Sequence, residues 1–412
     1  MTQAVQISAP QARASEAKIV GNVCFAHFVS HYYIILLAPL FVFVREDYGV
    51  SYTELGLALT MFNVVSTVLQ TPAGFLVDRI SARLVLVAGL VLGAAAFAVA
   101  AMVDSFWVFV AMFGVAGIAN TVYHPADYAL ISQHVPAERL GRMFSFHTFA
   151  GMLGNAAAPP LSLYLQSQAG WRGAFIGAAV IGLIAAASLL MQGEPAVDAA
   201  RKDKAPAGGG DPALQGWRLL FSTPIVLNLL FFVLLAISGS GMQNYLIATL
   251  GELYGTPAAL ANVALTALLL MGALGVLAGG VLASRTTRHG LVAAIGLLAT
   301  GVVTAAVGIA DPGAVLLVLL MSASGFFSGM SMPSRDMIVR SVTPPGAFGR
   351  VFGFVTTGFN IGGIVAPLIF GQLLDHGQPR AIFFCIAGSA LLAIATVVAG
   401  QTLRKPAARS QG

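Results

Sequence analysis

Twelve apolar runs divide this chain, and each is long enough to cross a membrane as a helix. The hydrocarbon layer is roughly 30 Å thick and takes about 20 helical residues to span. Only 9% of the residues are charged and 58% are hydrophobic, whereas about a quarter of a soluble domain is charged. We therefore predict an all-α membrane protein with helices near 18–44, 52–77, 82–103, 105–132, 139–166, 171–191, 222–250, 257–283, 287–310, 313–341, 347–373 and 379–401.

A polar segment separates the first six runs from the last six. Residues 192–218 combine charged residues with the glycine-rich stretch PAGGG, which is typical of a flexible linker. The sequence thus predicts a bundle at 1–191, a cytoplasmic linker at 192–218 and a second bundle at 219–412. Each bundle contains six helices.

Basic residues predict the orientation. With the amino terminus inside, 17 of the 21 basic residues fall in inner segments, and the outer segments hold only Arg45, Arg172 and Arg380. This asymmetry places both termini in the cytoplasm, as expected for a multi-pass protein of the inner membrane. Because the excess of positive charge is explained by topology, we expect no nucleic-acid partner. The two cysteines, Cys24 and Cys385, lie in apolar runs and predict no disulfide.

The two halves repeat each other. A shift of 206 places Gly74 on Gly280, Arg79 on Arg285 and Tyr48-Gly49 on Tyr254-Gly255. A shift of 208 aligns later positions, including Gly117 with Gly325, Pro125 with Pro333 and Arg172 with Arg380. Two similar six-helix bundles that both begin inside are related by an axis along the membrane normal, with a binding site between them.

Three segments resemble the major facilitator superfamily. Residues 74–83 read GFLVDRISAR, residues 280–289 read GVLASRTTRH, and residues 170–175 read GWRGAF. The resemblance implies the fold of that family, alternating access, a monomer in the lipid bilayer, and an inner gate formed by Gly74, Asp78, Arg79, Arg83 and Arg285.

Two further segments resemble particular branches. Residues 154–159, GNAAAP, are similar to an element associated with proton antiporters, although plain helix packing explains them equally well. Residues 123–127, YHPAD, resemble fosmidomycin-resistance-type exporters. These resemblances favour efflux.

Few ionisable residues lie within the apolar runs, and burying each in a membrane is costly. They are His27, His31, His124, Asp127, His147, Arg335 and Asp336. In the resembled family the first, fourth, seventh and tenth helices line the central cavity, and nearly all of these residues fall there. We interpret His147 as structural.

Arg335 is the expected anchor for an anionic or zwitterionic solute because arginine stays charged. We assign substrate binding to Arg335, His31, Gln243, Asn244 and Tyr32, and proton coupling to Asp127, His27, His31 and His124. The repeat places Asp127 on Arg335, so we expect the two to alternate between pairing and binding solute or proton.

The sequence predicts a secondary transporter and not an enzyme. It contains no phosphate-binding GxxxxGK loop, so we expect a proton gradient as the driving force and no cofactor. His27 and His31 lack an accompanying acid in the HExxH pattern, so we expect no metal site. Two alternatives stay open, namely proton symport for uptake of an organic acid and a membrane sensor that transports nothing.

Overall fold

The computed structural model describes residues 9–192, 217–344 and 348–402. The described chain is almost entirely helical and contains no strand. Its elements are α1 (Ala9–Ile35), η1 (Ala38–Leu40), α2 (Phe41–Tyr48), α3 (Tyr52–Arg79), α4 (Ala82–Met102), α5 (Phe106–His134), α6 (Ala137–Leu190), α7 (Trp217–Leu220), α8 (Thr223–Ser240), the π-helical turn η4 (Gly241–Tyr245), α9 (Leu246–Tyr254), α10 (Ala258–Arg285), α11 (His289–Ile309), α12 (Gly313–Val342), α13 (Phe348–Asp375) and α14 (Pro379–Thr402).

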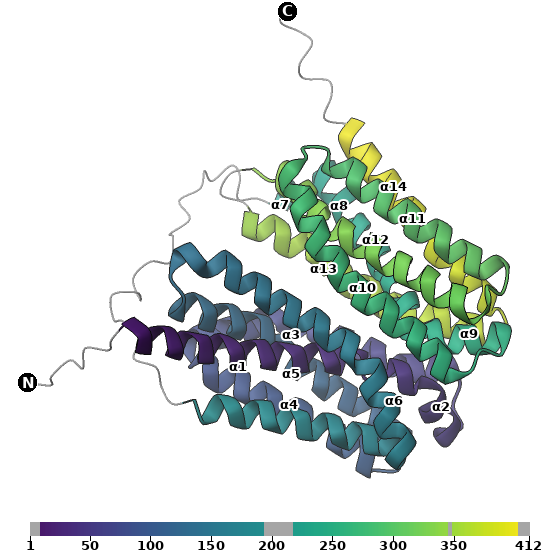
Figure 1. The fold of residues 1–412 in the computed structure, drawn as a ribbon, viewed down its shortest axis with the longest axis horizontal. Helices are drawn as coiled ribbons and strands as arrows, with labels where there is room; N and C mark the ends of the chain where they lie inside the picture. The colour runs from purple at the N-terminus through teal and green to yellow at the C-terminus, as the bar shows by residue number, and fades with distance from the viewer. Residues whose placement is uncertain (1–8, 193–216, 345–347, 403–412) are drawn as a thin grey trace, which may run out of the picture.

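Eleven helical segments in the described ranges are long and apolar enough to cross a membrane. One of them, Glu138–Leu190, has 53 residues. At 1.5 Å per residue a straight helix of that length would measure about 80 Å, far more than the hydrocarbon layer. The backbone leaves helical geometry at Ala169 and Gly170, where Gly170 has φ +69°. Figure 1 shows the second part of α6 running back beside α4, so α6 supplies two of the twelve predicted crossings.

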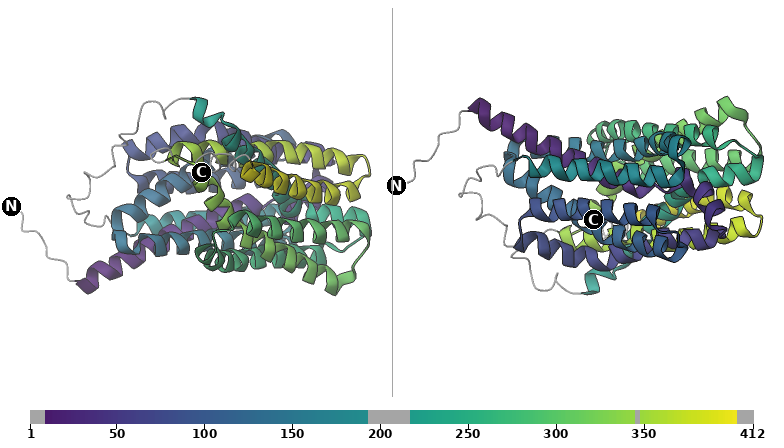
Figure 2. Two further views of the ribbon diagram at one scale, coloured as in Figure 1. Left: turned by 90° about the horizontal axis from the view of Figure 1, so that it is seen from above. Right: turned by 90° about the horizontal axis from the view of Figure 1, so that it is seen from below.

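The helices form two bundles. α1 to α6 pack with one another, and α8 to α14 pack with one another (Figure 1). The helices of both bundles run roughly along one common direction (Figure 2). Most of the linker predicted at 192–218 lies outside the described residues.

Equivalent residues of the two halves occupy equivalent places. Gly49 and Gly255 end α2 and α9 in left-handed conformations, with φ of 63° and 64°. A side chain in this conformation is strained, which explains glycine at both positions. A Cβ on Gly117 would lie 2.6 Å from the carbonyl oxygen of Phe62, and one on Gly325 would lie even closer to the carbonyl oxygen of Leu268. Both glycines therefore allow two helices of one bundle to approach closely.

Contacts between the bundles gather near α2 and α9, the end of the molecule away from the start of α1 and the end of α14 (Figure 1). The Thr60 hydroxyl donates to the carbonyl of Ile364 at 3.2 Å, and Asn262 Nδ2 donates to the carbonyl of Pro159 at 3.0 Å. The Tyr52 hydroxyl donates to Glu252 Oε1 at 2.7 Å. These bonds close that end of the bundle interface.

Candidate functional site

A cavity of about 370 Å³ lies between the two bundles. One side of its wall comes from α1, α3, α5 and α6, and the other from α8, η4 and α10 to α13. Its polar lining includes Asn63, Asn155, Ser238, Gln243, Asn244, Ser328 and Arg335. A concave, mostly apolar wall with a few polar groups from both halves is typical of a small-molecule site.

Arg335 is the single charged residue in the described wall of this cavity. Its Nε donates to Asp336 Oδ1 at 2.8 Å. The guanidinium carbon lies 5.0 Å from the ring centre of Phe232 and 5.2 Å from that of Phe359. No described group bonds the two terminal nitrogens. These contacts orient the guanidinium and leave its fork available for an anion.

Gln243 and Asn244 reach the cavity from the π-helical turn η4. Such turns insert an extra residue into an α-helix and occur frequently at functional sites. Asn244 Nδ2 lies 3.4 Å from Ser240 Oγ, and Asn244 Oδ1 has no hydrogen-bond partner among the described residues. The turn therefore places two amide side chains in the wall.

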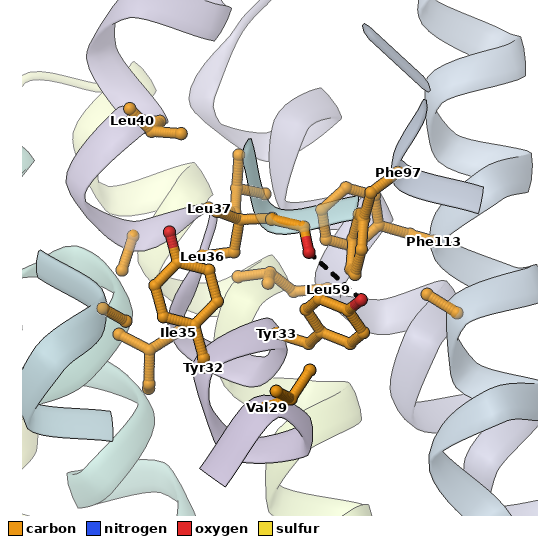
Figure 3. Close-up of a cluster of buried hydrophobic side chains, with 14 of the residues drawn as sticks. Val29, Tyr32, Tyr33, Ile35, Leu36, Leu37, Leu40, Leu59, Phe97 and Phe113 are labelled. Carbon is orange, nitrogen blue, oxygen red and sulfur yellow. Dashed lines mark hydrogen bonds between the residues drawn. The ribbon is translucent and has the colours of Figure 1, made fainter. Parts of the chain in front are cut away.

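Two residues that the sequence assigns to substrate binding, His31 and Tyr32, do not line this cavity. His31 lies beside Asn155, and Tyr32 packs inside the first bundle. Its side chain is fully buried, and its hydroxyl lies 3.1 Å from Ser162 Oγ. Tyr33 lines the cavity instead, and its hydroxyl donates to the carbonyl of Ala178 at 3.2 Å. Figure 3 shows the two rings on opposite sides of α1, because consecutive residues point about 100° apart around a helix.

Asp127 lies at the centre of a histidine cluster within the first bundle. Its Oδ2 lies 3.0 Å from His147 Nε2, within hydrogen-bond geometry, and 3.3 Å from His27 Nδ1. Exposure of these three side chains is at most 3%. In this conformation Asp127 thus contacts histidines and Arg335 contacts Asp336, so the expected pairing of Asp127 with Arg335 is absent.

Two more histidines complete the cluster. The ring centre of His27 lies 4.5 Å from that of His31 and 5.0 Å from that of His124. His31 is half-buried and His124 is exposed. The structure therefore brings together all four residues assigned to proton coupling and adds His147. From the sequence we interpret His147 as structural, although its place in an apolar run is a signal that it could belong to such a cluster.

Helix spacing and one glycine build this cluster. His27 and His31 are one turn apart on α1, and His124 and Asp127 share a face of α5. A Cβ on Gly151 of α6 would lie 2.6 Å from His27 Nε2. Glycine at this position therefore lets α6 approach α1 closely enough for His147 to reach Asp127.

His27, Asp127 and His147 have ligand atoms within 4.8 Å of one another, a spacing seen in metal sites. The rings of His27 and His147 are stacked, however, with centres 3.7 Å apart and planes 19° apart. A metal lies close to the plane of each imidazole that binds it, and two nearly parallel stacked planes share no nearby point. The geometry favours a hydrogen-bonded cluster, and the absence of a metal site stays a prediction.

The residues assigned to the inner gate lie away from the closed end. Arg79 and Arg285 are exposed, and a Cβ on Gly74 would meet nothing within 4 Å. Arg83 donates to the carbonyls of Leu189 and Leu190, both in its own bundle. The side chain of Asp78 lies outside the described part of the structure.

Comparisons with known proteins agree with this arrangement. A family model described as Major Facilitator Superfamily matches residues 23–248 and 229–411. A crystal structure of a variant of the nucleoside transporter NupG superposes with a TM-score of 0.77 at 15% identity, covering 93% of this chain and 99% of that one. This likeness shows the fold.

Three curated relatives match most of the chain. A probable sulfoacetate transporter of Cupriavidus necator is 27% identical over 398 residues, covering 90% of each protein. The D-galactonate transporter of Escherichia coli is 22% identical over 399 residues, covering 88% of this chain and 90% of the relative. The fosmidomycin resistance protein of Escherichia coli is 20% identical over 390 residues, covering 92% of each. The last match confirms the resemblance that residues 123–127 indicated.

Proposed function

The chain belongs to the Major Facilitator Superfamily, and from that premise we propose that it is a secondary active transporter that moves small organic anions by coupling to protons. One observation carries the proposal, namely the oriented and otherwise unpaired fork of Arg335 in the cavity between the bundles. A guanidinium fork matches the two oxygens of a carboxylate or sulfonate. Relatives named for sulfoacetate and galactonate support the same class of solute.

The histidine cluster supports proton coupling. Asp127 is fully buried and contacts two imidazoles, so its charge depends on where the protons of the cluster lie. The side chain of His124 is exposed, so protons can enter or leave the histidine cluster through it. Other titratable groups near Asp127 are Cys24, Tyr123 and Tyr128, and Tyr128 also lies within electrostatic range of Asp336.

The conformation supports alternating access. We place the protein in the inner membrane with both termini in the cytoplasm. In that orientation the closed end faces outward and the cavity opens toward the cytoplasm. The moving units are residues 1–191 and 219–412, and a single copy contains the whole cavity. Closure of the opposite end brings together the segments of Gly74, Arg79, Arg83 and Arg285.

Two directions of transport use the same sites. Likeness to the fosmidomycin resistance protein favours efflux by exchange for protons. Likeness to transporters of sulfoacetate and galactonate favours symport of an organic acid. A proton gradient imposed on vesicles separates the two, because exchange accumulates solute in an acid interior and symport accumulates it from an acid exterior.

The test is counterflow of labelled D-galactonate and sulfoacetate in proteoliposomes. We expect the wild-type chain to move at least one of the two, Arg335→Ala to move neither, and Arg340→Ala to match wild type. Arg340 is an exposed arginine at the end of the same helix and serves as the matched control. Failure of wild type to move either anion, or full activity of Arg335→Ala, would contradict the proposal. Binding without movement would indicate a sensor, and transport that ignores both pH gradients would contradict proton coupling.

A further inference from the structure

We infer that the cavity selects a hydroxylated organic monoanion over a dianion and over an unsubstituted acid. This inference rests on the proposed function, because it concerns the solute of the same cavity. The acid group would lie on Arg335, and hydroxyl groups would bond the neutral amides of the wall, chiefly Asn155 and Asn244.

The charge of the wall limits the ligand to one acid group. Arg335 is the single charged residue in the described lining, so one guanidinium balances one carboxylate or sulfonate. A second acid group would leave water without a second cation to receive it. The carboxylate of Asp336, which bonds Arg335 Nε at 2.8 Å, would also repel a second negative charge nearby. A dianion is therefore a poor match.

The amides of the wall match hydroxyl groups. Asn155 on α6 and Asn244 in η4 are both half-buried at the cavity. The carbonyl oxygen of Asn244 has no hydrogen-bond partner among the described residues. That of Asn155 makes no well-formed hydrogen bond either, and the ring of His31 is the polar group beside it. A hydroxyl both donates and accepts, so it satisfies an asparagine amide in either orientation of the side chain. A bare alkyl chain would give neither carbonyl oxygen a donor.

The two amides come from opposite halves of the protein. Asn155 belongs to the first bundle, whereas Asn244 and Arg335 belong to the second. A ligand with its acid group on Arg335 and a hydroxyl on Asn155 therefore bridges the bundles. Asn155 also lies beside His31, whose ring centre is 4.5 Å from that of His27. The hydroxylated end of the ligand thus lies next to the proton cluster.

Three acids on one four-carbon frame test the inference. Threonate is a hydroxylated monoanion, butyrate is the unsubstituted monoanion, and succinate is the dianion. Binding of each to the purified full-length protein is measured by isothermal titration calorimetry at neutral pH. We expect threonate to bind at least about tenfold more tightly than butyrate, and succinate to bind most weakly.

Variants assign the preference to named residues. Asn155→Leu and Asn244→Leu should each weaken threonate binding by about tenfold and change butyrate binding less than about twofold. Asn228→Leu is the matched control, because Asn228 bonds the carbonyl of Pro224 in its own helix and does not line the cavity. Thermal unfolding of each variant checks that it is folded.

Each outcome decides a separate claim. Equal binding of threonate and butyrate would overturn the role of the hydroxyls, and succinate binding as tightly as threonate would overturn the argument from a single cation. Unchanged threonate binding in both asparagine variants would overturn their assignment. Counterflow of D-galactonate that depends on Arg335 would preserve the proposed function in all three cases. Binding of sulfoacetate, a dianion without a hydroxyl group, as tightly as threonate would overturn the inference. Binding of none of the three acids would overturn the inference, and loss of counterflow as well would overturn the proposed function.

Discussion

Asp375, the last residue of α13, caps the first turn of α3 through Thr53 of the opposite bundle. Asp375 Oδ2 accepts a hydrogen bond from the backbone nitrogen of Thr53 at 2.9 Å, and Oδ1 accepts one from that of Tyr52 at 2.7 Å. The first backbone N–H groups of a helix have no partner within the helix and favour negative charge. A carboxylate of one bundle thus satisfies a helix start of the other, which stabilises closure of this end.

Replacing Asp375 with Asn should favour opening of this end. Loss of the charge should make closure of this end less favourable by about 1 kcal/mol. The ratio of open to closed molecules should then rise roughly fivefold. The measurement is the distance between spin labels at Glu46→Cys and Ala314→Cys, two exposed positions of opposite bundles, with Cys24 and Cys385 replaced by Ala.

Asp311→Asn is the control for that measurement. Asp311 is an exposed acid whose Oδ1 accepts from the backbone nitrogen of Gly313 in the same bundle. Its replacement should leave the label distances as they are in the parent protein. If Asp375→Asn also leaves them unchanged, the cap does not hold this end closed.

Helix positions were predictable from the sequence because apolar length and the repeat both report on backbone topology. Hydropathy located the crossings, and the equivalence of Gly49 with Gly255 appears as two matching left-handed helix ends. Two predicted helices join as α6, with the break at Ala169 and Gly170. The helix predicted at 18–44 begins earlier, at Ala9, and is divided into α1, η1 and α2, and the one predicted at 222–250 is interrupted by η4.

Side-chain direction was less predictable. The repeat places Asp127 on Arg335, yet it carries no information about which neighbour each side chain contacts. His147 lies 20 residues from Asp127 on another helix, and only packing at Gly151 brings the two together. Tyr32 and Tyr33 look alike in the sequence, but the phase of the helix sends only Tyr33 to the cavity. Asn155 has no sequence signal because its unpaired oxygen is a property of the packed state.

Removing the acid of the histidine cluster should uncouple transport from protons. Asp127→Asn keeps the shape of the side chain but removes its charge, so protonation of His27 or His147 no longer changes a charge pair. We expect accumulation driven by a pH gradient to disappear, while counterflow without a gradient stays within about threefold of wild type. Accumulation is measured with labelled solute in proteoliposomes of known orientation.

His147→Gln should reduce coupling in the same assay, because His147 Nε2 lies 3.0 Å from Asp127. His134→Gln is the matched control, since His134 lies at the end of α5 and bonds the carbonyl of Leu130 in its own helix. A cluster with a purely structural role would show equal losses of driven accumulation and counterflow in the Asp127 and His147 variants.

Adding one methyl group at Gly151 should disturb the cluster. A Cβ there would lie 2.6 Å from His27 Nε2 and 2.8 Å from His31 Cδ2, so either the two imidazoles or α6 itself must shift. We expect Gly151→Ala to lower the free energy of unfolding by about 1–3 kcal/mol and to lower the Tm measured by thermal unfolding in detergent.

Gly141→Ala is the control on the same helix, because a Cβ at Gly141 would meet nothing within 4 Å. This change should leave the free energy of unfolding unchanged or raise it by up to about 1 kcal/mol, because alanine has a higher helix propensity than glycine. Equal Tm values for the two variants would mean that the approach of α6 to α1 at the cluster is looser than the structure shows.

Replacing Arg335 with Lys should separate shape from charge in the cavity. Lysine keeps the positive charge, but it has no planar fork to bind two oxygens and cannot pack as a flat group against the adjoining rings of Phe232 and Phe359. It also loses the bond from Nε to Asp336 that orients the guanidinium. We expect the KM for the transported anion to rise at least about tenfold, while the maximal rate falls less. Initial rates of uptake over a range of anion concentrations give both values, and Arg340→Lys on the same helix should change neither. A KM equal to that of wild type would mean that Arg335 acts only as a point charge.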